Sequence, residues 1–131
     1  MPLLLRVAAA YNVAFALLLL VHPAAAFRWL ALPATPDIIV QALGMMVGVY
    51  GLAYGIAAAD PQRYWPLVVV GIVGKTLGPI GFVYGLAMGS LPRESGVLIL
   101  ANDLVWWLPF WLILLRVRRS WWPRRQTGHT G

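Results

Sequence analysis

The sequence predicts an all-α fold: an integral membrane bundle of four transmembrane helices. The chain has 131 residues, of which 61% are apolar and only 11% are charged. A soluble domain usually has about 45–50% apolar and about 25% charged residues. The mean hydropathy of +0.78 also indicates a chain that is more apolar than a soluble domain. Four long apolar stretches use up most of the chain, so we expect a single membrane domain over residues 1–131 and no separate soluble domain.

The four expected spans cover residues 3–21, 38–59, 67–88 and 97–115. At a rise of about 1.5 Å per residue, each is long enough to cross a hydrocarbon core of about 30 Å. Proline-containing turn signals separate the spans. After the first span, residues 24–32 are expected to form a short interfacial helix, with Phe27 and Trp29 in the lipid and Arg28 at the headgroups.

The arginines predict the orientation. Four spans put both termini on one side of the membrane, and that side holds seven arginines, whereas the other side holds only Arg28 and Arg93. Because positive charge stays in the cytoplasm, we expect a membrane protein with cytoplasmic N- and C-termini. The seven arginines are Arg6, Arg63, Arg116, Arg118, Arg119, Arg124 and Arg125.

An alternative for the N-terminal segment is a cleaved signal peptide. One arginine, an apolar run and the small residues 24–26 after Pro23 resemble a secretory signal with its cleavage site. The length of the run and the central Asn12 favour a retained first span, and both interpretations leave the C-terminus inside.

Glycines recur at steps of three and four residues in the second and third spans. In lipid, close backbone approach through small residues drives helix association, and this spacing is typical of a left-handed crossing. We therefore expect the two stripes to meet, within one chain or across a dimer. The stripes consist of Gly44, Gly48, Gly51 and Gly55, and of Gly71, Gly74, Gly78, Gly81 and Gly85.

Polar residues near the middle of the spans predict a buried cluster. Charge inside a membrane is costly and marks a functional site by default. The Lys75 and Asp103 backbones should differ in depth by about 6 Å, which a lysine side chain can cover. We expect a Lys75–Asp103 ion pair, with Asn12, Asn102 and a tyrosine hydroxyl, such as that of Tyr50, as hydrogen-bond partners.

Two tryptophans and two prolines lie near this cluster. Trp107 follows Asp103 by four residues, so its indole is expected to reach the carboxylate; alternatively, Trp106 and Trp107 form the walls of an apolar pocket with a polar floor. Pro79 and Pro109 each free a backbone carbonyl one turn earlier. The pair either fixes helix register or belongs to a ligand, proton or substrate site.

The composition excludes several function classes. The chain has no cysteine, which excludes disulfides, thiolate metal sites and thiol peroxidase chemistry. Asp103 is the only acid within a span, so two-carboxylate catalysis is excluded as well. No metal, cofactor or nucleic acid is expected, and no catalytic residue is assigned. The basic tail, residues 116–131, is expected to act as a topogenic stop or to contact lipid headgroups through Arg116, Arg118, Arg119, Arg124 and Arg125.

The glycine-rich second span (residues 44–59), the sequence GKTLGPIGFVYG (residues 74–85) and the closing NDLVWWLPF (residues 102–110) resemble a group of small bacterial inner-membrane proteins of uncertain function. The overall arrangement is similar to DoxX-like four-helix proteins. This resemblance implies a four-helix membrane fold and leaves the activity open. Relatives sometimes carry the label alkyl hydroperoxide reductase, an activity that a chain without cysteine does not support.

Three functional hypotheses follow. In the first, the protein is a non-enzymatic accessory or assembly subunit of a larger membrane complex, or a small homo-oligomer. In the second, it is a small transporter or proton-coupled carrier that uses Lys75 and Asp103. In the third, it is a membrane-embedded lipid- or quinone-binding protein or an enzyme. The lipid bilayer is a partner in all three.

Overall fold

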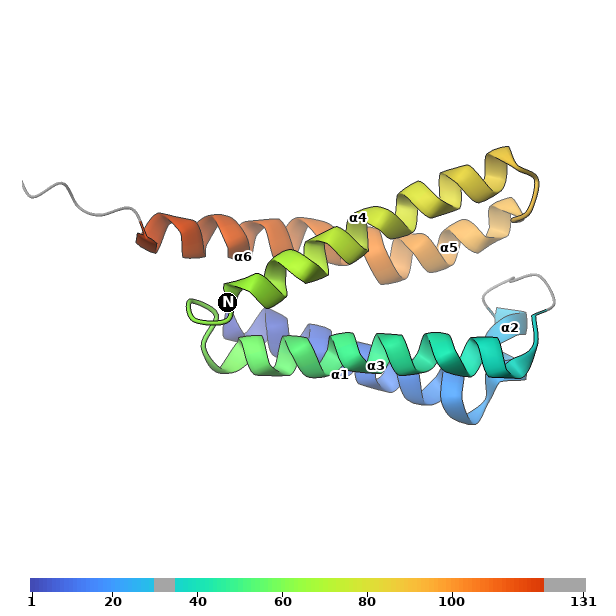
Figure 1. Cartoon of the computed structure of the whole chain (residues 1–131), viewed down its shortest axis with the longest axis horizontal. Helices are drawn as coiled ribbons and strands as arrows, with labels where there is room; N and C mark the ends of the chain where they lie inside the picture. The colour runs from blue at the N-terminus through green and yellow to red at the C-terminus, as the bar shows by residue number, and fades with distance from the viewer. Residues whose placement is uncertain (30–34, 122–131) are drawn as a thin grey trace, which may run out of the picture.

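The structure, a computed structural model, describes residues 1–29 and 35–121, and every regular element in these two ranges is a helix. Four helical segments are long and apolar enough to cross a membrane (Figure 1). The expected all-α, four-helix membrane fold is therefore confirmed.

The first three spans agree closely with the expected ranges. They are α1 (Pro2–Val21), α3 (Asp37–Ala59) and α4 (Trp65–Ala87). The fourth is a succession of η1 (Arg93–Ser95), α5 (Gly96–Ile99), a π-helical turn η2 (Leu100–Leu104) and α6 (Val105–Trp121). Prolines mark the beginnings of α1 and α4, where the missing N–H has no intrahelical partner to lose.

The short helix expected after the first span is present as α2 (Pro23–Trp29). Ala26 is fully buried and belongs to a small cluster with Leu19 and Val40, which holds α2 against α1 and α3. Trp29 is 76% exposed, which suits a side chain at the lipid interface. The Phe27 side chain and residues 30–34 of this expected helix lie outside the described part of the chain.

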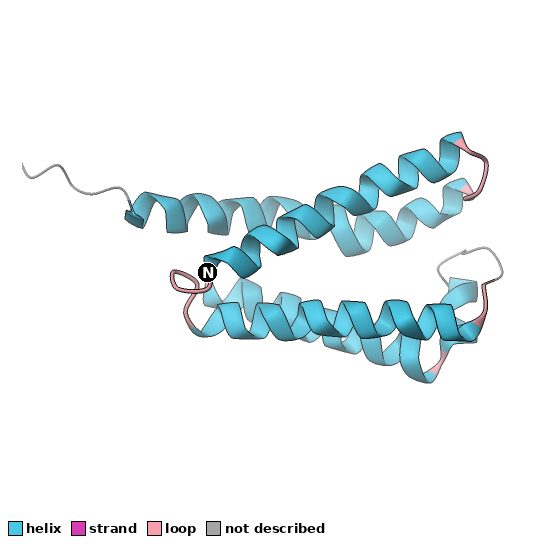
Figure 2. Cartoon of the chain, in the orientation of Figure 1, coloured by secondary structure: helices cyan, strands magenta, loops and turns pink. Residues whose placement is uncertain are grey.

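The helices form two layers. One layer contains α1, α2 and α3, and the other contains α4, α5 and α6 (Figures 1 and 2). The layers approach each other at the end that holds the N-terminus and diverge toward the end that holds α2 and the α4–α5 connection. The molecule is therefore V-shaped, with its two arms closed at the N-terminal end.

The buried core explains this shape. The large core cluster joins all four spans and includes Leu5, Tyr54, Val68 and Phe110, which lie toward the closed end. The smaller cluster, formed by Leu19, Ala26 and Val40, lies within the first layer only. Apolar packing between the layers is thus concentrated at the closed end.

The glycine stripe of α3 packs against α1. A Cβ added at Gly44 would lie 2.9 Å from Leu19 Cβ, and one added at Gly51 would lie 3.0 Å from Val13 Cγ2. Gly48 likewise faces Ala16. The expectation that this stripe meets the α4 stripe within one chain is wrong, because α1 already occupies the glycine face of α3.

The α4 glycines do not pack against a single helix; they lie against side chains from several parts of the chain. Gly71 gives room to the rings of Tyr54 and Phe110, and Gly74 to the Tyr50 hydroxyl. Gly78 lies against the Asp103 carboxylate, since an added Cβ would lie 2.8 Å from Asp103 Cγ. These small residues let aromatic and charged groups approach the α4 backbone closely.

Candidate functional site

A buried ion pair joins the two halves of the second layer. Lys75 lies in the middle of α4 and Asp103 in η2, and Lys75 Nζ is 3.6 Å from Asp103 Oδ1. The side chains are only 5% and 10% exposed. The predicted Lys75–Asp103 pair is therefore present. The two opposite charges offset each other, which lowers the cost of holding either in an apolar medium.

The π-helical turn places the groups around this pair. In a π-helix, backbone hydrogen bonds span five residues, and here the Val105 N–H donates to the Leu100 carbonyl. Lys75 Nζ also donates to the Asn102 carbonyl within this turn. Single π turns are rare and occur frequently at functional sites. The widened turn thus presents both a carboxylate and a backbone carbonyl to one ammonium group.

Of the expected hydrogen-bond partners, only Asn102 contacts the pair. Its Nδ2 donates to Asp103 Oδ1 at 3.0 Å. Asn12 is buried, but its Nδ2 donates to the Ala8 carbonyl one turn earlier, at 2.8 Å. Asn12 satisfies its own helix instead of the ion pair, because α1 lies in the opposite layer.

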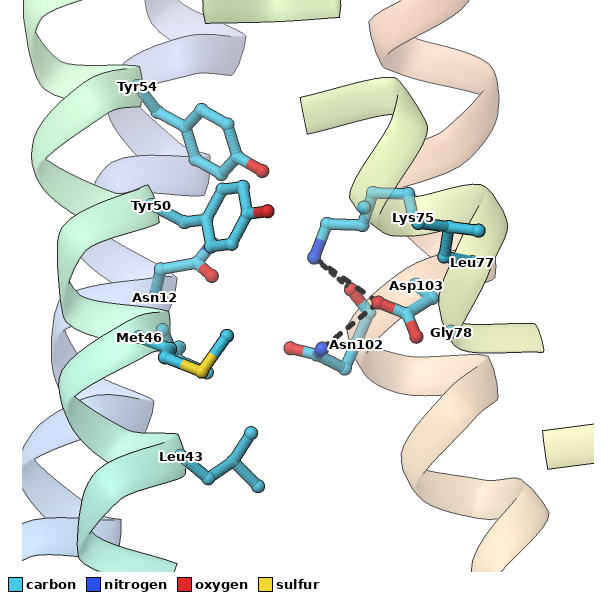
Figure 3. A pocket seen from close by; sticks show the side chains of 12 residues that line it. Asn12, Leu43, Met46, Tyr50, Tyr54, Lys75, Leu77, Gly78, Asn102 and Asp103 are labelled. Atoms are coloured by element: carbon cyan, nitrogen blue, oxygen red, sulfur yellow. Dashed lines mark hydrogen bonds and ion pairs between the residues drawn. The ribbon is translucent and has the colours of Figure 1, made fainter. Parts of the chain in front are cut away.

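The pair borders a cavity of about 400 Å³ between the layers. Figure 3 shows side chains from α1 and α3 facing Lys75, Asn102 and Asp103 across this space. The cavity thus has a charged wall on α4 and η2 and a largely apolar wall with tyrosines on α3. Its lining residues are Asn12, Leu43, Met46, Val47, Tyr50, Tyr54, Gly74, Lys75, Leu77, Gly78, Asn102 and Asp103.

The cavity unites five of the predicted cluster residues, and it also contains residues that were not predicted. Tyr54 is the most informative of these, because it lies one turn after Tyr50 on the same face of α3 and its ring packs edge-on against Phe110 at 4.8 Å. The four-residue spacing of Tyr50 and Tyr54, which places both on one helix face, is the sequence feature that could have predicted Tyr54 as a site residue. The apolar lining residues, Leu43 and Met46 on α3 and Leu77 on α4, have no sequence feature that separates them from lipid-facing residues.

The two tryptophans are placed differently from the prediction. Trp107 Nε1 donates to the Thr76 hydroxyl at 3.1 Å instead of reaching Asp103. Trp106 is buried against the Tyr11 ring, with 5.5 Å between the ring centroids. Neither belongs to the described lining of the cavity. The π turn contains Asp103 and shifts the helical phase, so a spacing of four residues no longer returns to the same face.

The basic segment begins as helix. Arg116, Arg118 and Arg119 lie on the last turns of α6 and are exposed, whereas Arg124 and Arg125 lie outside the described residues. α6 therefore extends beyond the expected end of the span at residue 115 and carries its first arginines on a rigid helix.

The described residues contain no group of three or more His, Asp or Glu side chains that could hold a metal ion. The site instead contains an ammonium group, a carboxylate, two amides and two phenols around a cavity with an apolar wall. Such a site can donate and accept hydrogen bonds to a small molecule. No family model, curated protein or solved structure matches the chain, so the function has to be inferred from this site.

Proposed function

We propose that this small membrane protein binds a lipid-soluble amphipathic molecule, of lipid or quinone type, in the cavity between its two layers. The observation that carries the proposal is the cavity of about 400 Å³ beside the buried Lys75–Asp103 pair. Ligand pockets typically measure about 300–1,000 Å³ and combine apolar walls with a few placed polar groups.

A purely structural role for the pair is less consistent with this geometry. A pair that only fixes helix register needs the contact between its two charges and no space beside it. Lys75 and Asp103 instead line an open space, and Tyr50 faces them from α3 (Figure 3). The polar groups are therefore available to a molecule between the layers.

The hydrogen-bonding inventory suggests what the ligand carries. A lysine ammonium has three donors. The Asn102 carbonyl accepts from Lys75 Nζ, whereas Asp103 Oδ1, at 3.6 Å, is an ion-pair partner beyond hydrogen-bond distance. A further N–H is therefore available to an acceptor such as a carbonyl or carboxylate oxygen. Asn102 Oδ1 is buried and accepts no hydrogen bond from the described residues, so it offers an acceptor to a ligand hydroxyl. The apolar part of the ligand would lie along Leu43 and Met46.

Native mass spectrometry of the protein extracted into nanodiscs with its own lipids tests the proposal. We expect a bound small molecule in the wild type, lost in Leu43→Trp, because the larger ring fills the cavity. Leu52→Trp is the matched control, since Leu52 is 64% exposed on α3 and does not line the cavity. Equal occupancy in the two variants would contradict the proposal.

The carrier hypothesis is favoured by a separate observation: the fourth span changes helix type at Asp103, and the continuous helix α4 contains a proline near Lys75. Pro79 lies inside α4 one turn after Lys75, and η2 interrupts the fourth span at Asp103. Interrupted helices at mid-membrane are typical of transporter binding sites. If the protein carries its ligand, Asp103→Asn should abolish proton-coupled uptake of that molecule into proteoliposomes that contain the same amount of folded protein as the wild-type ones.

The accessory-subunit and homo-oligomer hypotheses predict a different result in the native mass spectrometry experiment. A second polypeptide, or a second copy of this chain, would then be retained in the nanodisc without a small molecule in the cavity. The DoxX-like resemblance, the inner-membrane location and the cytoplasmic termini stay predictions that accompany this proposal.

A further inference from the structure

A second groove lies between α4 and α6 and shares one lining residue, Leu77, with the polar cavity. One part, of about 300 Å³, is lined by Trp65, Val69, Leu114, Val117 and Arg118. The adjoining part, of about 290 Å³, is lined by Val69, Ile72, Val73, Thr76, Leu77, Trp111 and Leu114. The two parts adjoin at Val69 and Leu114, which line both, and together they are called the α4–α6 groove. We propose that this groove binds one acyl chain of an anionic phospholipid, with the phosphate at Arg118.

The length of the groove suits an acyl chain. Along α4 it extends from Trp65 to Leu77, which corresponds to about 18 Å at the rise of an α-helix. One leaflet contributes about half of a hydrocarbon core of about 30 Å. A chain that starts at the Arg118 end therefore follows the groove through approximately its own leaflet.

The groove is apolar along this length. Thr76 is its one hydroxyl-bearing lining residue, and that hydroxyl is already engaged: it donates to the Ile72 carbonyl at 2.8 Å and accepts from Trp107 Nε1 at 3.1 Å. With its oxygen occupied, Thr76 offers mainly its methyl group to the groove. Hydrocarbon is thus the matching occupant of the interior of the groove.

Charge at one end selects the headgroup. Arg118 is exposed and forms no ion pair with a described residue, and Arg116 and Arg119 lie on the same helical end. The nearby acid of the α3–α4 turn, Asp60, accepts hydrogen bonds from the backbone of Gln62 and Arg63. A guanidinium binds phosphate oxygens in a bidentate manner, and basic sites between helices at the membrane surface are known binders of anionic headgroups.

The test is a titration of the purified protein with phosphatidylglycerol and with phosphatidylcholine of identical acyl chains, followed by native mass spectrometry. We expect phosphatidylglycerol to bind about fivefold more tightly, since one basic residue contributes about that factor near an anionic surface. Arg118→Gln should remove this preference. Arg116→Gln is the matched control, because Arg116 belongs to the same exposed cluster and does not line the groove.

A second pair of variants tests the acyl-chain part. Leu114→Trp fills the groove and should weaken the binding of both lipids at least fivefold, whereas Leu112→Trp, at a position 47% exposed on α6 and outside the groove, should not. Equal binding of the two lipids to the wild type would overturn the proposal. So would an equal loss in Arg118→Gln and Arg116→Gln, which would show diffuse attraction to surface charge instead of a site.

Discussion

At the scale of single residues, the buried Lys75–Asp103 pair is the main feature of the molecule. Lys75 and Asp103 are found together because neither can be placed alone in an apolar span at low cost. Asn102 supports the carboxylate and contributes a carbonyl to the ammonium group. The positive charge of Lys75 and the negative charge of Asp103 balance each other, so the stability of the bundle depends on the presence of both residues.

Lys75→Met should lower the free energy of unfolding by about 3 kcal/mol, because it leaves the Asp103 carboxylate buried without its cation. The double variant Lys75→Met/Asp103→Leu should recover to within about 1 kcal/mol of the wild type, since no unpaired charge remains. Denaturation by SDS in mixed micelles measures both values. A double variant as unstable as the single one would contradict this interpretation of the pair.

Trp107→Phe should lower stability by about 1 kcal/mol, the typical value of one hydrogen bond, because it removes the donor to Thr76. It should leave the occupancy of the cavity unchanged, since Trp107 does not line it. Ligand content per protein, measured by mass spectrometry, checks the second part. A loss of ligand in this variant would show that Trp107 contributes to the binding site and would contradict this prediction.

The sequence predicts the polar members of the site well. A lysine, an aspartate and two asparagines within apolar spans are visible without a structure. Their depths correctly indicate that Lys75, Asn102 and Asp103 meet, whereas Asn12 lines the same cavity without contacting the pair. The positions of Trp106 and Trp107 could not be obtained in this way. The phase of a helix after a π turn differs from that of a continuous α-helix, and nothing in the residue pattern marks η2 beforehand.

At the scale of helices, glycine spacing identifies a face but not its partner. The four glycines of α3 lie on one stripe as predicted, yet the stripe accepts α1, its neighbour along the chain. The α4 stripe accommodates aromatic rings and the Asp103 carboxylate. The spacing of glycines along a helix does not tell which other helix packs against them, since several helix faces in a small bundle can fit against small residues.

Gly44→Ala should destabilise the bundle by about 1 to 3 kcal/mol, because the added methyl group would press on Leu19 Cβ at 2.9 Å and on the Ala16 carbonyl at 3.1 Å. Gly81→Ala is the matched control: among the described residues, no atom lies within 4 Å of a Cβ added there. It should not destabilise the protein, since alanine is the better helix former. Equal unfolding free energies of the two variants would argue against the α1–α3 contact.

At the scale of the whole molecule, the V-shaped arrangement of two layers links fold to function. A shared core closes one end, while the two arms have separate cores or none at the other (Figure 1). The cavity lies between the arms. Span number and length follow from hydropathy alone, whereas this divergence depends on side-chain packing between layers, which no sequence period encodes.

Orientation can be tested with single cysteines, because the chain has none of its own. Gln62→Cys, in the α3–α4 connection, should react with a membrane-impermeant thiol reagent only in inside-out vesicles, and Glu94→Cys, in η1, only in right-side-out ones. The excess of arginine at the end that holds Gln62 is the physical reason. The opposite labelling pattern would invert the predicted topology.

The most direct test of the central claim is photocrosslinking from within the cavity in intact membranes. A benzophenone amino acid replaces Leu43, which lines the cavity, or Leu52, which does not, and the mass of each irradiated protein is measured. The account predicts an adduct of one defined small molecule at position 43 that is absent at position 52. If both positions give the same mixture of bulk phospholipid adducts, or if position 43 attaches to another polypeptide, the cavity is not a small-molecule site.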